Sequence, residues 1–130
     1  MIFKRKNISS LHLPHNKNTA ECAPVRINAP KEVLLPMDMH SGHVAEPIVA
    51  VGDYVKVGQL IAREEGRFSS PVHATVSGKV VAIEKILRPS GKEVQVIRIE
   101  NDGLMTVDSS VKAPTYTNPD EFLQAVRDSG

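Results

Sequence analysis

Cysteine, tryptophan and long apolar runs are scarce in this chain. Its 130 residues include one cysteine, Cys22, and no tryptophan. A single thiol excludes a disulfide within the chain and any metal or iron–sulfur site built from cysteines alone. The longest apolar runs, such as VVAI at 80–83, are far shorter than the about 20 residues of a membrane-spanning helix. The basic start MIFKRKNISS lacks the apolar core of a signal peptide.

Net charge and aromatic content are also low. Sixteen basic and fifteen acidic residues leave a net charge of +1, and aromatic residues make up 4% of the chain. Neither bulk charge nor a stacking platform therefore indicates a nucleic-acid partner. The length allows one domain with a modest core.

Short β-branched runs dominate the sequence from Glu32 onward. Each run is bounded by Gly, Pro, Ser or Asp, which is typical of a small all-β domain. The predicted strands are EVLLP, PIVAV, DYVKV, QLIARE, ATVS, KVVAIEKIL and EVQVIRIEN. The predicted core residues are Val49, Val51, Val55, Val57, Leu60, Ile61, Val80 and Ile83. In the last strand the alternation changes phase at Val96–Ile97, which predicts a bulge or an edge crossing there.

Turn residues divide these runs into two similar halves. Each half reads as an apolar run, a glycine turn and a second apolar run, a pattern that favours a compact sandwich of short strands. Glycine permits the positive φ that tight reversals need. The predicted structural turn residues are Gly42, Gly52, Asp53, Gly58, Gly78 and Gly91. We expect Asp53 to accept a backbone hydrogen bond in the turn at Gly52.

The two ends of the chain differ from this β region. Residues 1–31 are rich in proline and asparagine and predict an irregular arm, with room for one edge strand in APVRINAP. Residues 32–108 form the predicted domain, and residues 109–130 a linker and a short helix. Asn118 suits the N-cap and Pro119 the first helical position. Phe122 and Val126 form one apolar stripe on that helix.

Three sequence segments carry a resemblance to a known family. VGDYVKVGQLIA at 51–62 and SSPVHATVSGKV at 69–80 resemble the two halves of the biotinyl/lipoyl-type barrel-sandwich hybrid. Together with LHLPHNK at 11–17 and LPMDMHSGHV at 35–44, they resemble the N-terminal domain of RnfC, a component of an electron transport complex, over residues 8 to about 103. Ser9–Ser10 stand where that family has two glycines, and MHSGHV stands where it reads Gln-His-Ile-Gly-Ala-Pro. These departures indicate a divergent, RnfC-like member.

The resemblance implies a scaffolding and docking domain within a larger flavo-iron–sulfur protein. The parent protein would work between reduced ferredoxin and NAD and would hold FMN, NADH and two 4Fe–4S clusters in later Rossmann-like and ferredoxin-like domains. The final helix would lead into the Rossmann-like domain. This stretch itself would then hold no cofactor and catalyse nothing. Its partners would be the rest of its own chain and other subunits of an electron-transfer complex, and its location would be cytoplasmic, either free or held at the inner face of the cell membrane by those subunits.

Two alternatives remain open. One is a free-standing lipoyl/biotinyl-like binding module. The hairpin that carries the attachment lysine in such domains corresponds to REEGRFSSP at 63–71, which contains no lysine, so we expect neither covalent lipoyl nor biotin. The other is an electron-transfer subunit that feeds a reductase, similar to PduS or to the RnfC-like partner of proline reductase.

The histidines provide the remaining candidate site residues. His12 with His15, and His40 with His43, have an H-x-x-H spacing, but no acidic partner follows at zinc-site spacing, so we expect no metal site. The resemblance makes His12, Lys17 and His40 the candidate cofactor-binding residues. For His12 and Lys17 it implies a contact with a neighbouring cofactor domain or subunit, and loop structure is the alternative. His73 is interpreted as a packed strand histidine rather than a phosphocarrier, and Cys22 as incidental.

Overall fold

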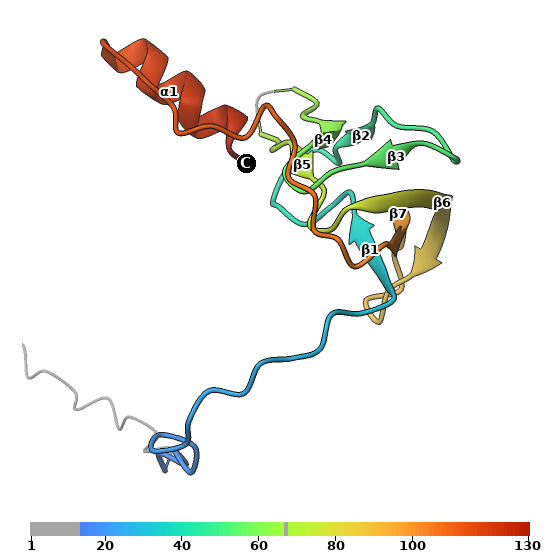
Figure 1. The fold of residues 1–130 in the computed structure, drawn as a ribbon, viewed down its shortest axis with the longest axis vertical. Helices are drawn as coiled ribbons and strands as arrows, with labels where there is room; N and C mark the ends of the chain where they lie inside the picture. The colour runs from blue at the N-terminus through green and yellow to red at the C-terminus, as the bar shows by residue number, and fades with distance from the viewer. Residues whose placement is uncertain (1–13, 67) are drawn as a thin grey trace, which may run out of the picture.

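Two antiparallel sheets and one short helix make up the computed structural model, which describes residues 14–66 and 68–130. The larger sheet has the order β1 (Glu32–Pro36), β7 (Glu93–Asn101), β6 (Gly78–Leu87) and β3 (Tyr54–Val55). The smaller sheet has the order β2 (Glu46–Pro47), β4 (Leu60–Arg63) and β5 (Val72–His73). The helix, α1, spans Pro119–Asp128 (Figure 1). The predicted mainly-β class with one short C-terminal helix is confirmed.

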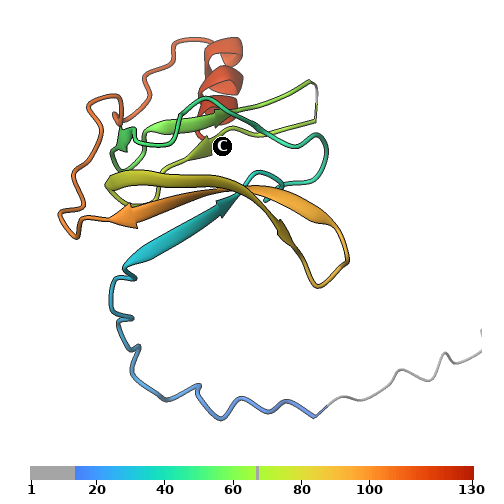
Figure 2. The ribbon, with the colours of Figure 1, turned by 90° about the vertical axis from the view of Figure 1, so that its right-hand side faces the viewer.

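Both sheets combine strands from both halves of the sequence. β1 pairs with β7 so that Glu32 lies opposite Glu100, and β3 pairs with β6. In the smaller sheet, β4 pairs with β5, with Leu60 opposite His73. Figure 2 shows the long β6–β7 ribbon curving beneath the smaller sheet. The two halves therefore complete each other's hydrogen bonding.

The core fills the space between the two sheets. Val55, Ile61 and Val80 are fully buried, as the sequence predicts, and Val49 and Ile83 pack against the core while partly buried. The other members of the core cluster are Leu35, Met37, Ala45, Ala62, Val72, Ala74, Val76, Ile97 and Ile99.

Three predicted core residues lie outside the core. Val57 is half-buried in an isolated parallel bridge with Val107 and does not belong to the core cluster. Val51 is 60% exposed because it stands in the turn that reverses the chain at Gly52. Leu60 is 37% exposed because the pairing of β4 shifts register between Leu60 and Ala62, so that Ile61 and Ala62 are both buried. Of the neighbouring residues Leu60 and Ile61, both predicted to be in the core, only Ile61 is therefore buried.

The predicted bulge at Val96–Ile97 is also wrong. β7 pairs in regular register with both neighbours at that point, and the irregularity lies in β6, between Val80 and Ala82. Ile97 belongs to the main core cluster, whereas Val96 is fully buried outside it. The break in alternation at Val96–Ile97 therefore reflects a strand, β7, that is buried on both faces rather than a bulge.

The predicted turn residues lie at chain reversals and close approaches. The φ angles are +111° at Gly42, +103° at Gly52, +80° at Gly58, +150° at Gly78 and +78° at Gly91. Asp53 accepts a hydrogen bond on Oδ2 from the backbone N–H of Ala50 at 2.8 Å.

The segments that flank the sandwich leave it at opposite ends (Figures 1 and 2). Residues 14–31 are exposed throughout, and the edge strand predicted in APVRINAP is not formed. The segment joins the body where the side chain of Asn101 donates to the carbonyl of Pro30 at 2.8 Å. At the other end, α1 has Asn118 as N-cap and no buried residue. No helix in the described part of the chain is both long and apolar enough to cross a membrane.

Candidate docking surface

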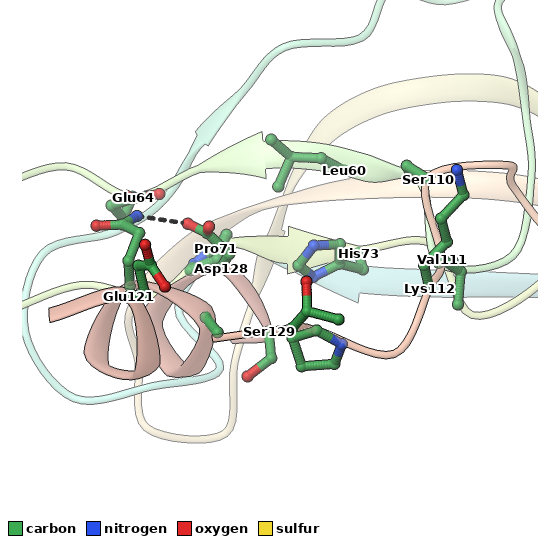
Figure 3. A pocket seen from close by; sticks show the side chains of 15 residues that line it. Leu60, Glu64, Pro71, His73, Ser110, Val111, Lys112, Glu121, Asp128 and Ser129 are labelled. Carbon is green, nitrogen blue, oxygen red and sulfur yellow. Dashed lines mark hydrogen bonds between the residues drawn. The ribbon is translucent and has the colours of Figure 1, made fainter. Parts of the chain in front are cut away.

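A cleft of about 830 Å³ separates α1 from the smaller sheet (Figure 3). We call it the helix cleft. Leu60 of β4 and His73 of β5 line one side, and the linker from Ser110 to Thr115 closes one end. The α1 residues along the cleft are Glu121, Gln124, Ala125 and Asp128, followed by Ser129.

The linker is attached to the sandwich beside Gly58. The N–H of Val57 donates to the carbonyl of Thr106, and the N–H of Asp108 donates back to Val57, both at 2.9 Å. Val111 then packs over Gly58, where an added Cβ would lie 2.3 Å from its Cγ2. Only a residue without a side chain leaves Val111 this position, and Gly58 also has a positive φ.

The first turn of α1 is closed by reciprocal hydrogen bonds. The Glu121 N–H donates to Asn118 Oδ1 at 2.9 Å. The Glu121 carboxylate accepts from the Thr117 N–H at 2.7 Å and from the Thr117 hydroxyl at 2.9 Å, and these bonds lower the pKa of Glu121. This arrangement satisfies N-terminal donors that would otherwise lack partners, so the helix begins sharply at Pro119.

The face of α1 toward the cleft is mostly polar. The side-chain amide of Gln124 donates to Asp128 at 2.7 Å, along the face that also carries Glu121 (Figure 3). The C-terminal end of the helix reaches the sandwich, since a Cβ on Gly130 would lie 3.1 Å from the carbonyl oxygen of Pro71. The residue at the end of the chain, just after α1, therefore lies close to the residue that precedes β5.

The large apolar residues of α1 are absent from the cleft lining. Phe122, Leu123 and Val126 are 45%, 53% and 52% exposed. The ring of Tyr116 packs edge-on against Phe122, with centroids 5.0 Å apart. An exposed apolar stripe on an ordered helix is typical of a surface that binds another body.

A second ordered feature joins residues 37–45 to the hairpin tip at 63–71, and we call it the loop clasp. Phe68 accepts a hydrogen bond on its carbonyl from the N–H of His43 at 2.7 Å, and an added Cβ on Gly42 would lie 2.0 Å from the same oxygen. The N–H of Ser70 donates to Nε2 of His40 at 3.2 Å. The clasp thus ties residues on the C-terminal side of the tip to the loop at 40–43.

The candidate site residues do not converge. His40 lies in the loop clasp, Lys17 is exposed in a turn of the arm, and His12 falls outside the described residues. His73 is half-buried at the helix cleft, and Cys22 is exposed. In residues 14–66 and 68–130, no group of three or more His, Cys, Asp or Glu side chains could hold a metal ion.

Sequence reasoning missed a polar network around Asp102. The carboxylate accepts from the hydroxyls of Tyr54 and Ser77 and from the N–H of Leu104, and these bonds, with Tyr54 the largest contributor, lower the pKa of Asp102. Ser77 is fully buried and accepts from the N–H of Thr106. The network holds the loop that precedes the linker. The turn sequence ENDG was its only local signal.

Comparison with known proteins identifies the domain. Residues 8–104 match the family model described as the RnfC barrel sandwich hybrid domain. The chain is 42% identical over 118 residues to the C subunit of the Na(+)-translocating ferredoxin:NAD(+) oxidoreductase complex of Acetobacterium woodii, covering 90% of this chain and 26% of that protein. It is 41% identical over 91 residues to the C subunit of the ion-translocating oxidoreductase complex of Rhodobacter capsulatus, covering 68% and 18%.

A third relative shows the same partial coverage. The chain is 35% identical over 126 residues to the corresponding protein of the ion-translocating oxidoreductase complex of Pseudomonas aeruginosa, covering 92% of this chain and 16% of that protein. The chain thus spans about a quarter or less of the length of these relatives. The resemblance stated from the sequence is confirmed, and the chain belongs to the RnfC barrel sandwich hybrid domain family.

Proposed function

We propose that this chain is the N-terminal docking module of an RnfC-like protein that transfers electrons between reduced ferredoxin and NAD. In this proposal residues 32–108 are the rigid body, residues 1–31 an arm, and residues 109–130 the connection to a redox-active remainder. The observation that carries the proposal is the apolar stripe of α1, which includes Phe122 and Val126 and is exposed in this chain. The names and partial coverage of the relatives support the same proposal.

The stripe needs an outside partner for a physical reason. An isolated helix of ten residues is marginal in water, and its apolar side chains gain stability only when another surface covers them. The cleft lining of α1 is mostly polar, so the sandwich does not provide that surface. The Rossmann-like domain of the parent chain is the proposed partner, with further subunits of the complex beyond it.

The redox cofactors are assigned to the remainder of the parent protein. FMN, NADH and two 4Fe–4S clusters would be bound there, since a cluster needs several thiolates and this chain has only Cys22. The loop clasp and the absence of lysine in residues 63–71 argue against a swinging lipoyl or biotin arm. His12 and Lys17 are proposed to contact the remainder or a neighbouring subunit, and His40 to hold the tip.

The setting of the module follows from the same relatives. Ion translocation, which their names record, takes place across a membrane. We place the module beside the inner face of that membrane, held there within the complex.

Co-elution with the separately expressed remainder of the parent protein tests this proposal. We expect the chain to bind the remainder, and F122S/V126S to abolish binding because the stripe is lost. L87S/L104S is the matched control, since Leu87 and Leu104 are 71% and 73% exposed outside α1. Binding that survives F122S/V126S would refute the docking role. Flavin or iron–sulfur absorbance in the purified chain would refute the assignment of cofactors elsewhere.

A further inference from the structure

Charge is distributed unevenly along the chain. Residues 1–31 contain six lysines and arginines and one acidic residue, Glu21, which gives a net charge of +5. Residues 32–130 contain ten basic and fourteen acidic residues, which gives −4. The near-neutral total therefore conceals a basic arm attached to an acidic body.

Residues 14–29 of the arm make no described hydrogen bond to the body. All residues from 14 to 31 are exposed, and the backbone hydrogen bonds within residues 14–29 are local turns, such as the Ala20 N–H to the Lys17 carbonyl at 3.1 Å. Val25 and Ile27 are 88% and 90% exposed on either side of Arg26. The arm thus carries one exposed apolar–basic–apolar triplet, Val25-Arg26-Ile27, on a segment that runs away from the two sheets (Figure 2).

We propose that this arm binds the anionic lipid surface of a bilayer, a proposal that rests on the placement of the module beside a membrane. Anionic headgroups attract spaced lysines and arginines without demanding a fixed geometry, which suits an extended segment. Interleaved apolar residues add burial at the headgroup boundary. A nucleic acid is disfavoured because residues 1–31 contain no tyrosine or tryptophan and a single phenylalanine, Phe3, for stacking.

The arm is long enough to bind an anionic membrane even though the membrane repels the acidic body. An anionic membrane repels a body of charge −4, but the repulsion is screened within about 8–10 Å at physiological salt. The eighteen residues from 14 to 31 can span at most roughly 60 Å when extended. The arm can therefore lie on the bilayer while the body stays beyond the range of that repulsion.

Vesicle co-sedimentation of the purified 130-residue chain tests the proposal. We expect binding to vesicles of equal parts phosphatidylglycerol and phosphatidylcholine, weak binding to phosphatidylcholine alone, and loss of binding at about 0.5 M salt. K17Q/R26Q/K31Q should lower the partition coefficient at least about tenfold, since each removed cation weakens the attraction. V25S/I27S should lower it by a smaller factor through the loss of apolar burial.

A control of equal net charge isolates the arm. Lys79, Lys85 and Lys92 are exposed in the body, so K79Q/K85Q/K92Q removes the same charge there. We expect the partition coefficient of this variant to stay within about threefold of that of the unchanged chain, because the body lies too far from the membrane for its charge to be felt there. Circular dichroism checks that each variant remains folded.

Three outcomes would overturn the inference. They are equal binding to acidic and neutral vesicles, equal losses in the arm and body variants, and binding to poly-glutamate or RNA without binding to vesicles. No redox partner is present in this experiment and no lipid in the co-elution experiment. Vesicle co-sedimentation therefore tests the inference alone and co-elution tests the proposed function alone, so that the failure of one is distinguished from the failure of the other.

Discussion

At the scale of single residues, Gly58 determines how the linker lies on the sandwich. Gly58→Val places a β-branched side chain at a positive φ and into the space of Val111. We expect the free energy of unfolding in urea to fall by about 1–3 kcal/mol or more. Gly52→Val is the matched control, since Gly52 also has a positive φ but has no atom within 4 Å of an added Cβ. Gly52→Val should lower the free energy of unfolding by less than Gly58→Val does, and it should leave amide exchange in residues 109–115 unchanged. An unaltered urea midpoint for Gly58→Val would contradict the prediction.

Asp102 gives the chain a defined response to acid. Its pKa is lowered from an ordinary value near 3.8, chiefly by the hydrogen bond from Tyr54. The stabilisation is present above that ordinary value and is lost as the pH falls through it toward the lowered folded pKa. Urea titrations from pH 5 downward should show a flatter pH dependence for Asp102→Asn than for the unchanged chain. Tyr54→Phe should flatten it only in part, and equal slopes in all three proteins would refute the assignment.

Sequence reasoning was most successful where a residue's role is local. The apolar runs between turn residues predict burial of Val55, Ile61 and Val80, and these three residues are buried. Val51, Val57 and Leu60 belong to the same runs but lie outside the core, because an apolar run does not reveal a turn or a register shift. Gly58 was singled out as a turn residue, but its contact with Val111 depends on chain more than fifty residues away.

At the scale of elements, the loop clasp is held by the His40 imidazole, by the His43 N–H and by the His43 carbonyl, which accepts from the Ser69 hydroxyl at 3.0 Å. His40→Ala removes the acceptor for the Ser70 N–H, so exchange of the Ser70 amide should accelerate, with a global cost below about 1.5 kcal/mol. His43→Ala is the matched control, because His43 joins the clasp through its backbone N–H and would keep that bond. Equal protection of the Ser70 amide in both variants, measured by hydrogen exchange, would show that the imidazole of His40 does not hold the tip.

The elements differ in how far the sequence predicts them. α1 was predicted because its signals are adjacent, namely Asn118, Pro119 and the acidic residues that follow. The loop clasp and the helix cleft were not, because they arise where separate loops meet after the sheets have formed. The missed bulge in β6 has the same origin, since the burial of β7 on both faces is set by the whole fold.

At the scale of the whole molecule, a rigid body carries two appendages at opposite ends (Figure 1). Residues 14–29 make no described hydrogen bond to the body, so removal of residues 1–27 should change the free energy of unfolding by less than about 0.5 kcal/mol. Asn101→Ala, which breaks the bond to the Pro30 carbonyl, is the comparison that affects the point of attachment. A larger loss on truncation, measured in urea, would mean that the arm packs on the body in solution.

The pairing of β1 with β7 has a consequence for biosynthesis. Glu32 leaves the ribosome sixty-eight residues before its partner Glu100. At about 5–20 residues per second, β1 waits roughly 3–14 s with its edge uncovered. Throughout that interval the nascent strand is open to wrong partners, so slow translation or delayed chaperone capture would penalise this domain more than one assembled from neighbouring hairpins.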